Sequence, residues 1–329
     1  MAYLLDVAAG SYFPLAPHHT FGRLAPSVNT HVDKPYVSKL HAAIEWNNSH
    51  WRIKNLGLNG TWVNGVSLGQ SDSRELSLGD EIYFAEQTDP GFKVIDLAPP
   101  ADMLWPLEQD LGTTSPIYLS RYHLLPDTEQ PELALFFDEQ SQQWYQEPLH
   151  QQNEIEAPEL NDGDLVQFGN SHWQFVRAQI YGPTEIKSSR HINDYEFIFT
   201  TSLDEETTQL ELHHQQTLDL AIRTHHYLLL QLARHRAQDA ERGLDSKSQG
   251  WVYADQLAAE LGVDGTHMNI QIFRARKQLA DSLPDTQGQQ CLLERRGGKI
   301  RFGCEKFKIY KGETLTLASP AMSCQASHE

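Results

Sequence analysis

Five short polar motifs follow one another near the start of the chain and supply groups that bind anions. They are FGR (21–23), SKLH (38–41), NGT (59–61), NG (64–65) and LGD (78–80). A phosphate at neutral pH carries nearly two negative charges and three acceptor oxygens, so guanidinium groups, hydroxyls and backbone N–H groups hold it well. Arg23 and Ser38 are of these types, and Lys39 adds a cation.

The segments around these motifs predict short strands separated by turns. HAAIEW (41–46) and HWRIKNL (50–56) flank NNS, which is a hairpin signal. EIYFA (81–85) and FKVIDLA (92–98) come after the Asn-Gly turns. Strands at this spacing predict an all-β sandwich over residues 1–98, and a linker rich in proline and polar residues over 99–115.

The ordered set of motifs resembles the forkhead-associated (FHA) family over about residues 3–98. The resemblance implies a β-sandwich that binds phosphothreonine peptides through the loops at one end. It implies that Arg23 and Ser38 contact the phosphate, that Asn59 hydrogen-bonds the peptide backbone, and that His41 braces the loop of Ser38. Gly22 and Gly60 are expected to allow turns that a side chain would strain. The implied phosphopeptide-binding set is Arg23, Ser38, Lys39, Asn59, Thr61 and Asn64.

One position departs from the family pattern. The residue before Asn59 is often Ser or Thr in the family and helps to hold the phosphate, but here it is Leu58. The change removes a hydroxyl, so we expect weakened or redirected binding. The alternative is an intact fold with a role other than phosphate binding.

Residues 116–180 predict a second, divergent copy of the first domain. ELNDGDLVQFG (159–169) parallels ELSLGDEIYFA (75–85), and ALFFDEQSQQWYQEP (134–148) parallels AAIEWNNSHWRIKNL (42–56). The alternative is coincidence between two strand-rich segments. The second copy has no Gly-Arg or Asn-Gly pair, so we expect a degenerate FHA-like β domain that has lost the phosphate residues.

The C-terminal part contains a net basic segment in an otherwise acidic chain. Residues 266–311 hold ten Lys/Arg and four Asp/Glu, which gives +6, whereas the net charge of the whole chain is −18. Such a segment is typical of a nucleic-acid site, and chance clustering on one hairpin is the alternative. The sequence from 195 onward predicts this order of elements. A strand hairpin over 195–214 comes first, and a helix capped by Thr224 and a short helix over 254–261 that ends at Gly262 follow it. A third helix capped by Thr266 and a hairpin around Gly297-Gly298 come last.

The segment THMNIQIFRARKQLA (266–280) resembles the recognition helix of the winged-helix output domain of bacterial response regulators, and the resemblance covers about 193–312. It implies that the third helix enters the major groove and that the hairpin wing follows the DNA backbone. The implied DNA contacts are His267, Asn269, Gln271, Arg274, Lys277, Arg295, Arg296, Lys299 and Arg301. A basic solvated face, or a winged helix that binds protein, is the alternative.

Two features of this region depart from that family. The loop GVDG (262–265) is short where the family often touches RNA polymerase, and the polar insertion 236–250 is longer than expected. Activation by direct polymerase contact is therefore not expected. The last residues, 313–329, are small and polar and predict a disordered tail.

The sequence as a whole predicts a multidomain, cytoplasmic, non-enzymatic protein without metal or other cofactor. No run approaches the roughly 20 apolar residues of a membrane-spanning helix, and the motifs of kinases, nucleophile elbows and zinc sites are missing. The expected function is a phosphothreonine-dependent bacterial regulator that binds a phosphorylated partner or a Ser/Thr kinase. The same protein is expected to bind double-stranded DNA, and paired half-sites would suit a homodimer. The alternative is a signalling adaptor in which the winged helix binds protein.

Overall fold

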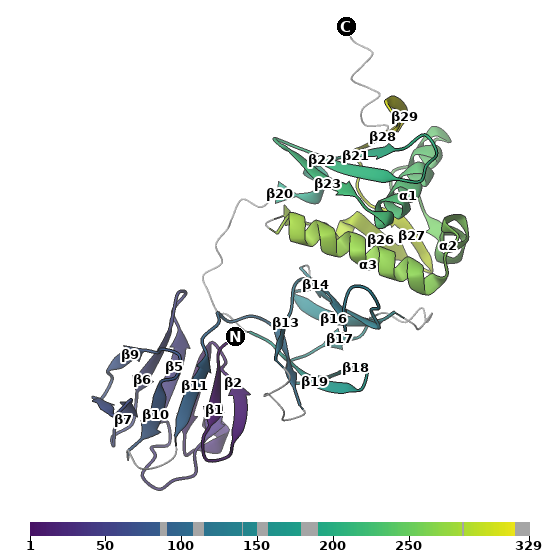
Figure 1. Ribbon diagram of the computed structural model, residues 1–329. Helices are drawn as coiled ribbons and strands as arrows, with labels where there is room; N and C mark the ends of the chain where they lie inside the picture. Colours follow the sequence, from purple (N-terminus) through teal and green to yellow (C-terminus); the bar gives the residue numbers. More distant parts are fainter. Residues whose placement is uncertain are drawn as a thin grey trace. The chain divides into compact units, whose positions relative to one another are not determined.

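The computed structural model describes residues 1–85, 91–107, 115–139, 141–149, 157–178, 190–284 and 286–319 (Figure 1). The chain divides into two compact units, each described here by itself. Unit 1 comprises Met1–Leu119 and Asn161–Thr184, and unit 2 comprises Ser120–Leu160 and Glu185–Glu329. The segment 120–160 is thus inserted in the chain of unit 1 but packs in unit 2.

The first part of unit 1 is a sandwich of two sheets. One sheet has the order β2-β1-β11-β10-β7-β8 and the other the order β4-β3-β5-β6-β9. All neighbours are antiparallel except β3 and β4. The elements are β1 (Tyr3–Asp6), β2 (Ser11–Pro14), β3 (His18–Gly22), η1 (Ala25–Ser27), β4 (Thr30–His31), β5 (Ala42–Trp46), β6 (Trp51–Asn55), β7 (Thr61–Val63), β8 (Val66–Leu68), β9 (Ser73–Glu75), β10 (Glu81–Phe84) and β11 (Phe92–Asp96).

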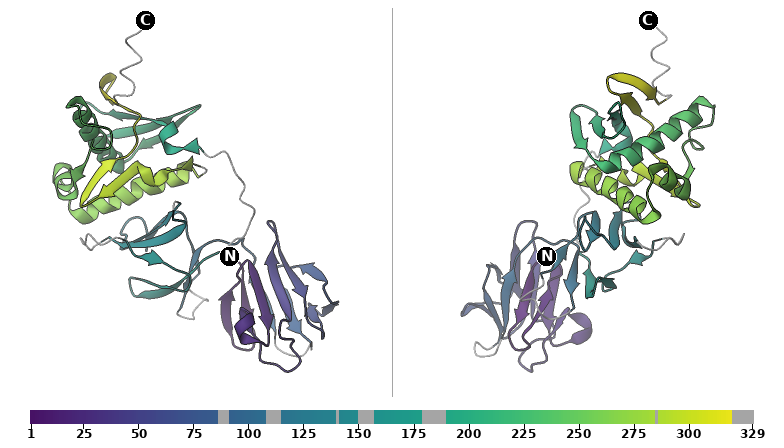
Figure 2. Two further views of the ribbon diagram at one scale, coloured as in Figure 1. Left: turned by 180° about the vertical axis from the view of Figure 1, so that it is seen from behind. Right: turned by 45° about the vertical axis from the view of Figure 1, so that its right-hand side comes forward.

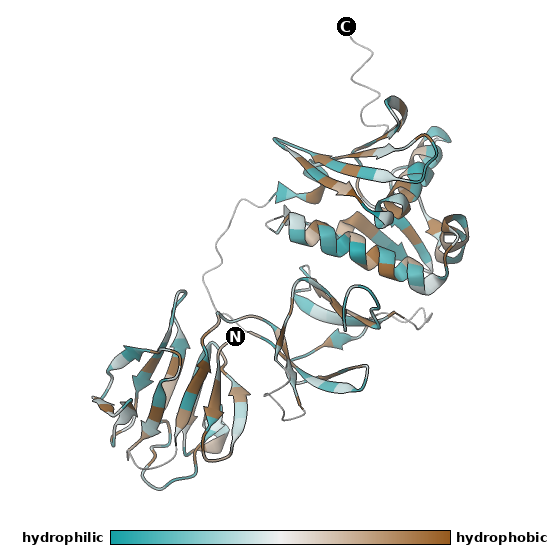
Figure 3. Cartoon of the chain, in the orientation of Figure 1, coloured by the Kyte–Doolittle hydropathy of each residue, from teal (hydrophilic) through white to brown (hydrophobic). Residues whose placement is uncertain are grey.

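Alternating apolar residues hold this sandwich together. Along β6, Trp51 and Ile53 are buried while Arg52 between them is exposed, as the two-residue period of a strand requires. Phe21, Ile44 and Val63 complete the inner faces, and Figure 3 shows the same alternation of brown and teal along the strands. The predicted β-sandwich is confirmed.

A smaller sheet of unit 1 shows that the linker predicted over 99–115 is wrong in part. Met103 and Leu104 are fully buried in β12 (Met103–Pro106). This strand pairs with β13 (Ile117–Tyr118) and β19 (Ser171–Val176), and β18 (Leu165–Phe168) completes the order β13-β12-β19-β18. Residues 108–114 lie outside the described part of the chain.

A second small sheet belongs to unit 2 and has the order β14-β15-β16-β17. Its strands are β14 (Tyr122–Leu125), β15 (Leu133–Asp138), β16 (Gln143–Pro148) and β17 (Glu159–Leu160). Within each sheet the strand order repeats that of the large sandwich: β13-β12-β19-β18 matches β2-β1-β11-β10, and β14-β15-β16-β17 matches β3-β5-β6-β9.

One turn of this region reproduces a turn of the large sandwich. Asp164 accepts the N–H of Asn161 (2.7 Å) as Asp80 accepts the N–H of Ser77 (2.9 Å). The intervening glycines, Gly163 and Gly79, have φ of 89° and 83°, a conformation that favours glycine. These matches support the predicted divergent copy over 116–180, which stays a prediction because the strands divide between the two units and residues 179–180 are not described.

The C-terminal part of unit 2 combines three α-helices with three sheets, the smallest of which pairs β20 (Arg190–His191) with β25 (Thr286–Gln287) (Figure 2). A five-stranded sheet has the order β23-β22-β21-β28-β29, and a three-stranded sheet has the order β24-β27-β26. The elements are β20 (Arg190–His191), η2 (Ile192–Asp194), β21 (Glu196–Thr201), β22 (Thr208–His213), β23 (Thr217–Ile222), α1 (Thr224–Glu241), β24 (Val252–Tyr253), α2 (Ala254–Leu261), α3 (Gly265–Ser282), β25 (Thr286–Gln287), η3 (Gln289–Leu292), β26 (Leu293–Arg296), β27 (Lys299–Phe302), β28 (Phe307–Lys311) and β29 (Thr314–Ala318).

Several predicted boundaries shift in this region. The cap of α3 is Asp264, whose carboxylate accepts the His267 N–H (2.8 Å), and Thr266 lies inside the helix. Thr224 is the first residue of α1, after the cap Arg223. Gly262 ends α2 in the left-handed conformation (φ 67°) as predicted.

Two predictions of irregular structure are wrong in part. Helix α1 continues to Glu241, so the first residues of the insertion predicted over 236–250 are helical, and Arg236 is buried there. Thr314–Ala318 of the predicted disordered tail form β29, which pairs with β28. The remaining residues, 320–329, are not described. No helix in the described residues has the length and apolarity that a membrane crossing needs.

Candidate phosphopeptide site and candidate nucleic-acid interface

Three loops at one end of the large sandwich carry Arg23, Ser38 and Asn59. Arg23 follows β3, and its N–H donates to the Ser38 carbonyl (3.0 Å), which joins the first two loops. The Arg23 Nε donates to the Val37 carbonyl (3.2 Å), while the residue as a whole stays exposed. The guanidinium is therefore anchored through its Nε to the backbone of the loop that contains Ser38.

His41 fixes the loop of Ser38 to the loop of Asn59. Its Nδ1 accepts the Ser38 N–H (3.0 Å), so its Nε2 carries the proton and donates to the Gly60 carbonyl (3.0 Å). The ring is fully buried, and burial lowers its pKa. The neutral imidazole therefore keeps one acceptor and one donor, as this bridge requires.

The loop of Asn59 is held from both sides. The Asn59 side-chain NH₂ donates to the Tyr36 carbonyl (2.8 Å), and the Leu58 N–H points to the Ser38 Oγ (3.4 Å). Below them, buried Asn55 accepts from the Gly57 N–H (3.1 Å) and from the Thr61 hydroxyl (3.0 Å). Sequence reasoning missed Asn55, because an asparagine at a strand end gives no signal that separates a buried brace from a turn residue.

Close backbone approach explains the glycines of the site. A Cβ on Gly22 would lie 2.2 Å from the Lys39 carbonyl oxygen, so Gly22 lets two loops meet rather than forming a turn. A Cβ on Gly57 would lie 2.6 Å from the His41 Nδ1, and this glycine was also missed. Gly60 has φ of 83° and does require its flexibility for a turn.

Two residues of the predicted binding set have supporting positions instead. Thr61 is fully buried at the start of β7 and bonds Asn55, so it cannot touch a peptide. Asn64 lies at the other end of β7, where its side chain bonds the Asp80 carboxylate (2.7 Å) and the Glu81 N–H (2.9 Å). The prediction of peptide contact is wrong for Thr61, because the motif pattern does not distinguish an exposed hydroxyl from a buried one. For Asn64, which is exposed, peptide contact stays a prediction.

The second β region lacks the equivalent groups. It contains a Ser-x-x-His pattern, but His123 accepts the Ser120 N–H (3.4 Å) at the start of β14, as His19 accepts the Ala16 N–H (3.2 Å) at the start of β3. The pattern therefore matches residues 16–19 and not the loop of Ser38. By the same alignment Pro126-Asp127 stands where the FHA sandwich has Gly22-Arg23, and the cation is replaced by an anion.

The predicted DNA-contacting residues of helix α3 are largely engaged within unit 2. Arg274 donates to the Thr128 carbonyl, and Lys277 reaches the Ser120 Oγ (3.3 Å) and the Asp281 carboxylate (3.3 Å). His267 is exposed beside Asp264 (2.9 Å). Gln271 is half-buried.

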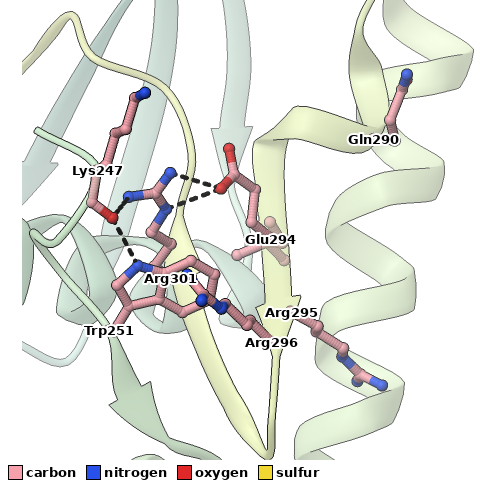
Figure 4. A pocket seen from close by; sticks show the side chains of 8 residues that line it. Lys247, Trp251, Gln290, Glu294, Arg295, Arg296 and Arg301 are labelled. Carbon is pink, nitrogen blue, oxygen red and sulfur yellow. Dashed lines mark hydrogen bonds and ion pairs between the residues drawn. The ribbon is translucent and has the colours of Figure 1, made fainter.

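The predicted wing carries four basic residues, and three of them, Arg295, Arg296 and Arg301, line a pocket of about 630 Å³ (Figure 4). Arg301 bonds Glu294 (2.6 Å) and stacks on Trp251 (4.6 Å). Arg295 donates to the Glu147 carboxylate (2.9 Å) and to the Asn269 side-chain oxygen Oδ1 (2.9 Å). Lys299 lies over the Tyr253 ring (4.5 Å), and Arg296 is exposed.

Comparisons with known proteins identify one part of the chain. Residues 19–85 match the model of the FHA domain family. Among solved structures, Mycobacterium tuberculosis EmbR in complex with a low-affinity phosphopeptide is 30% identical over 30% of this chain and 25% of that chain, with a TM-score of 0.27. The FHA domain of an Arabidopsis thaliana hypothetical protein is 24% identical over 30% and 88%, with a TM-score of 0.27.

A third structure, the MEK1 FHA domain in complex with a HOP1 phosphopeptide, is 21% identical over 29% of this chain and 97% of that chain, with a TM-score of 0.25. No curated protein sequence matches the chain. The matched residues 19–85 contain Arg23, Ser38 and Asn59, and they form an FHA domain.

Proposed function

We propose that this protein binds a phosphothreonine-bearing partner through Arg23, Ser38 and Asn59 and uses its C-terminal winged helix to regulate transcription at DNA. The observation that carries the first half is the joining of three loops by His41 and by the Arg23 N–H within an FHA domain. A phosphate placed there would meet a guanidinium and a hydroxyl on loops already fixed in place. Pre-organisation of this kind lowers the entropy lost on binding.

A phosphopeptide library tests this site in the full-length protein. Arg23→Ala or Ser38→Ala should abolish selection of phosphothreonine peptides, because charge-assisted hydrogen bonds to phosphate contribute about 1.5–3 kcal/mol each. Arg52→Ala is a matched control, since Arg52 is an exposed arginine of β6 near the opposite end of β5. Retained binding by both site variants would place the phosphate elsewhere.

The proposed DNA-binding half is supported by the order of elements in unit 2. Helices α1, α2 and α3 are followed by the hairpin β26–β27, and β24, between α1 and α2, pairs with β27. This order agrees with the winged helix that the sequence resembles, in which α3 is the recognition helix. The basic residues of α3 and of the hairpin then contribute phosphate and base contacts.

Selection of fragmented genomic DNA by the full-length protein tests this half. Enrichment of a defined sequence is expected, and repeated half-sites would indicate a homodimer. Arg296→Ala should weaken DNA binding. It should also reduce the slope of log K for DNA binding against log salt concentration by about one, since one phosphate contact is lost. Lys247→Ala is a matched control on the rim of the same pocket. A salt dependence that Arg296→Ala leaves unchanged removes this residue from the interface.

A specific observation favours the adaptor as a second candidate. Arg295 and Arg301 pair with the carboxylates of Glu147 and Glu294, and Lys277 lies beside Asp281. Charges neutralised by local carboxylates fit a surface that binds protein rather than nucleic acid. A folded protein that selects phosphothreonine peptides but enriches no DNA would be an adaptor.

A further inference from the structure

Helix α3 has two covered faces rather than one. Met268, Ile272, Ala275 and Leu279 face the core of the helices and the wing. Residues follow one another at 100° around a helix, so Ile270, Phe273, Lys277 and Ala280 lie on the opposite face. On that outer face Phe273 is 1% exposed and Ala280 is 6% exposed. A recognition helix offers this face to the DNA groove.

The cover of the outer face is the sheet β14–β17 of residues 120–160, hereafter the cover sheet. Tyr122, Leu124, Ala134 and Leu149 of this sheet form one buried cluster with Phe273 and Ala280. Phe136 stacks between Tyr122 and Tyr145 and meets the Phe273 ring at 6.2 Å between centroids. Figure 1 shows β14 beside α3 within unit 2.

Polar contacts surround this apolar cluster. The Thr128 carbonyl accepts from Arg274, the Ser120 Oγ accepts from Lys277 (3.3 Å), and Glu147 pairs with Arg295 of the wing (2.9 Å). Arg295 in turn bonds Asn269 (2.9 Å). The cover sheet therefore engages the same cations that the winged helix would present to phosphates.

A helix in this state cannot enter a DNA groove. The major groove is about 12 Å wide and a helix with its side chains is about 10–12 Å across, so the groove admits a helix alone. A sheet packed on the outer face adds a further layer, since packed layers lie about 10 Å apart. Binding in the groove requires the cover sheet to leave.

We propose that the cover sheet is an autoinhibitory element, and that α3 binds DNA only after the sheet is released. This inference rests on the proposed DNA-binding function. A ligand that binds only the open state has an apparent affinity reduced by the fraction of molecules that are open. Weakening the cover should therefore raise the affinity for DNA without any new contact to DNA.

Thiol labelling measures the cover independently of DNA. Ala280→Cys is introduced into the full-length chain after Cys291→Ser, Cys304→Ala and Cys324→Ser, and its rate of alkylation is followed. Labelling should be slow in this background and at least tenfold faster with Glu147→Lys, which sets a cation against Arg295. Glu159→Lys makes the same charge change on β17, at an exposed position of the same sheet, and should label slowly.

Leu124→Ala is a second way to weaken the cover, by loss of apolar contact, with the circular dichroism spectrum as a check of folding. Fast labelling in the starting background would overturn the proposal. Slow labelling that neither variant accelerates would also overturn it, because the contact would then be permanent.

DNA affinity is measured on the same proteins with the duplex enriched from genomic DNA, or with a random-sequence duplex at low salt. Glu147→Lys and Leu124→Ala should bind about tenfold more tightly or better, beyond any gain shown by Glu159→Lys. Equal affinity of Glu147→Lys and Glu159→Lys, with the cover open by labelling, would overturn the inhibitory role. If the opened proteins bind no DNA at all, the proposed DNA-binding function fails instead, and α3 has a different ligand.

Discussion

In the FHA domain, residues of similar chemistry have two different roles: some are placed to contact a phosphopeptide, and others support the loops. Ser38 and Thr61 both carry hydroxyls, yet Ser38 lies at the loop surface and Thr61 is buried against Asn55. Arg23, Ser38 and Asn59 lie on adjacent loops, whereas Asn64 braces a distant turn. The motif order was sufficient to predict that these three residues lie together, and their contact with phosphate and peptide stays a prediction. It could not separate the others, because burial depends on strand pairing that single positions do not encode.

Leu58 is the residue at which binding strength should respond to a single change. Its side chain is 83% exposed, and its N–H lies beside the Ser38 Oγ. We expect Leu58→Thr to tighten binding of a selected phosphothreonine peptide about tenfold, because a hydrogen bond to a charged group contributes about 1.5 kcal/mol. Fluorescence anisotropy of the labelled peptide measures the change.

Leu58→Ala distinguishes the two possible causes. It removes the apolar side chain without supplying a hydroxyl, so its affinity should stay close to that of the unchanged protein. Equal tightening by the Ala and Thr variants would mean that Leu58 obstructs the phosphate rather than lacking a donor.

At the scale of elements, helix α3 depends on a cap that the sequence pattern did not identify. The Asp264 carboxylate accepts the His267 N–H (2.8 Å), while Thr266 is already helical. Asp264→Ala should therefore lower the free energy of unfolding of unit 2 by about 1 kcal/mol, the usual cost of losing a side-chain cap. Urea unfolding measures this change in the free energy of unfolding, and hydrogen exchange of the α3 amides shows whether the loss is local to the helix.

Thr266→Ala is the matched control for the cap. It removes a hydroxyl inside the first turn and should change the stability by less than about 0.5 kcal/mol. A larger effect of Thr266→Ala than of Asp264→Ala would contradict the observed cap.

The same elements show which parts of the fold can be predicted from local sequence signals. Helix α2 and the hairpin β26–β27 were predicted at their observed positions, because a left-handed glycine and a Gly-Gly turn mark them locally. Strand β12 was missed, because its partner β19 lies some 70 residues further along the chain and prolines surround it. Burial of Met103 comes from that pairing and leaves no local periodicity.

At the scale of the whole molecule, the net charge of a segment did not predict whether its basic side chains are accessible to DNA. The +6 segment over 266–311 predicted an open basic surface. Three of its ten cations, Arg295, Lys277 and Arg274, instead contact Glu147, Ser120 and the Thr128 carbonyl of an insertion more than a hundred residues earlier. Such contacts are decided by tertiary packing, so composition alone could not reveal the cover sheet.

Chain connectivity gives the cover sheet a route to the phosphate signal. Residues 120–160 pack in unit 2, but both ends of the segment, at 119/120 and 160/161, continue into unit 1, which contains the FHA domain. A ligand shifts an equilibrium only by its difference in affinity for the two states. A phosphopeptide that binds the open protein more tightly than the covered protein would therefore release α3.

We accordingly expect a saturating phosphothreonine peptide to raise the affinity for the enriched duplex at least fivefold, the lower end of measured allosteric couplings. Linkage requires that the duplex raise the peptide affinity by the same factor. Anisotropy titrations of labelled DNA with and without peptide, and of labelled peptide with and without DNA, give both factors. Arg23→Ala should remove the response while DNA binding without peptide stays unchanged. If the peptide binds the free and the DNA-bound protein equally well, the FHA domain recruits a partner without controlling the winged helix.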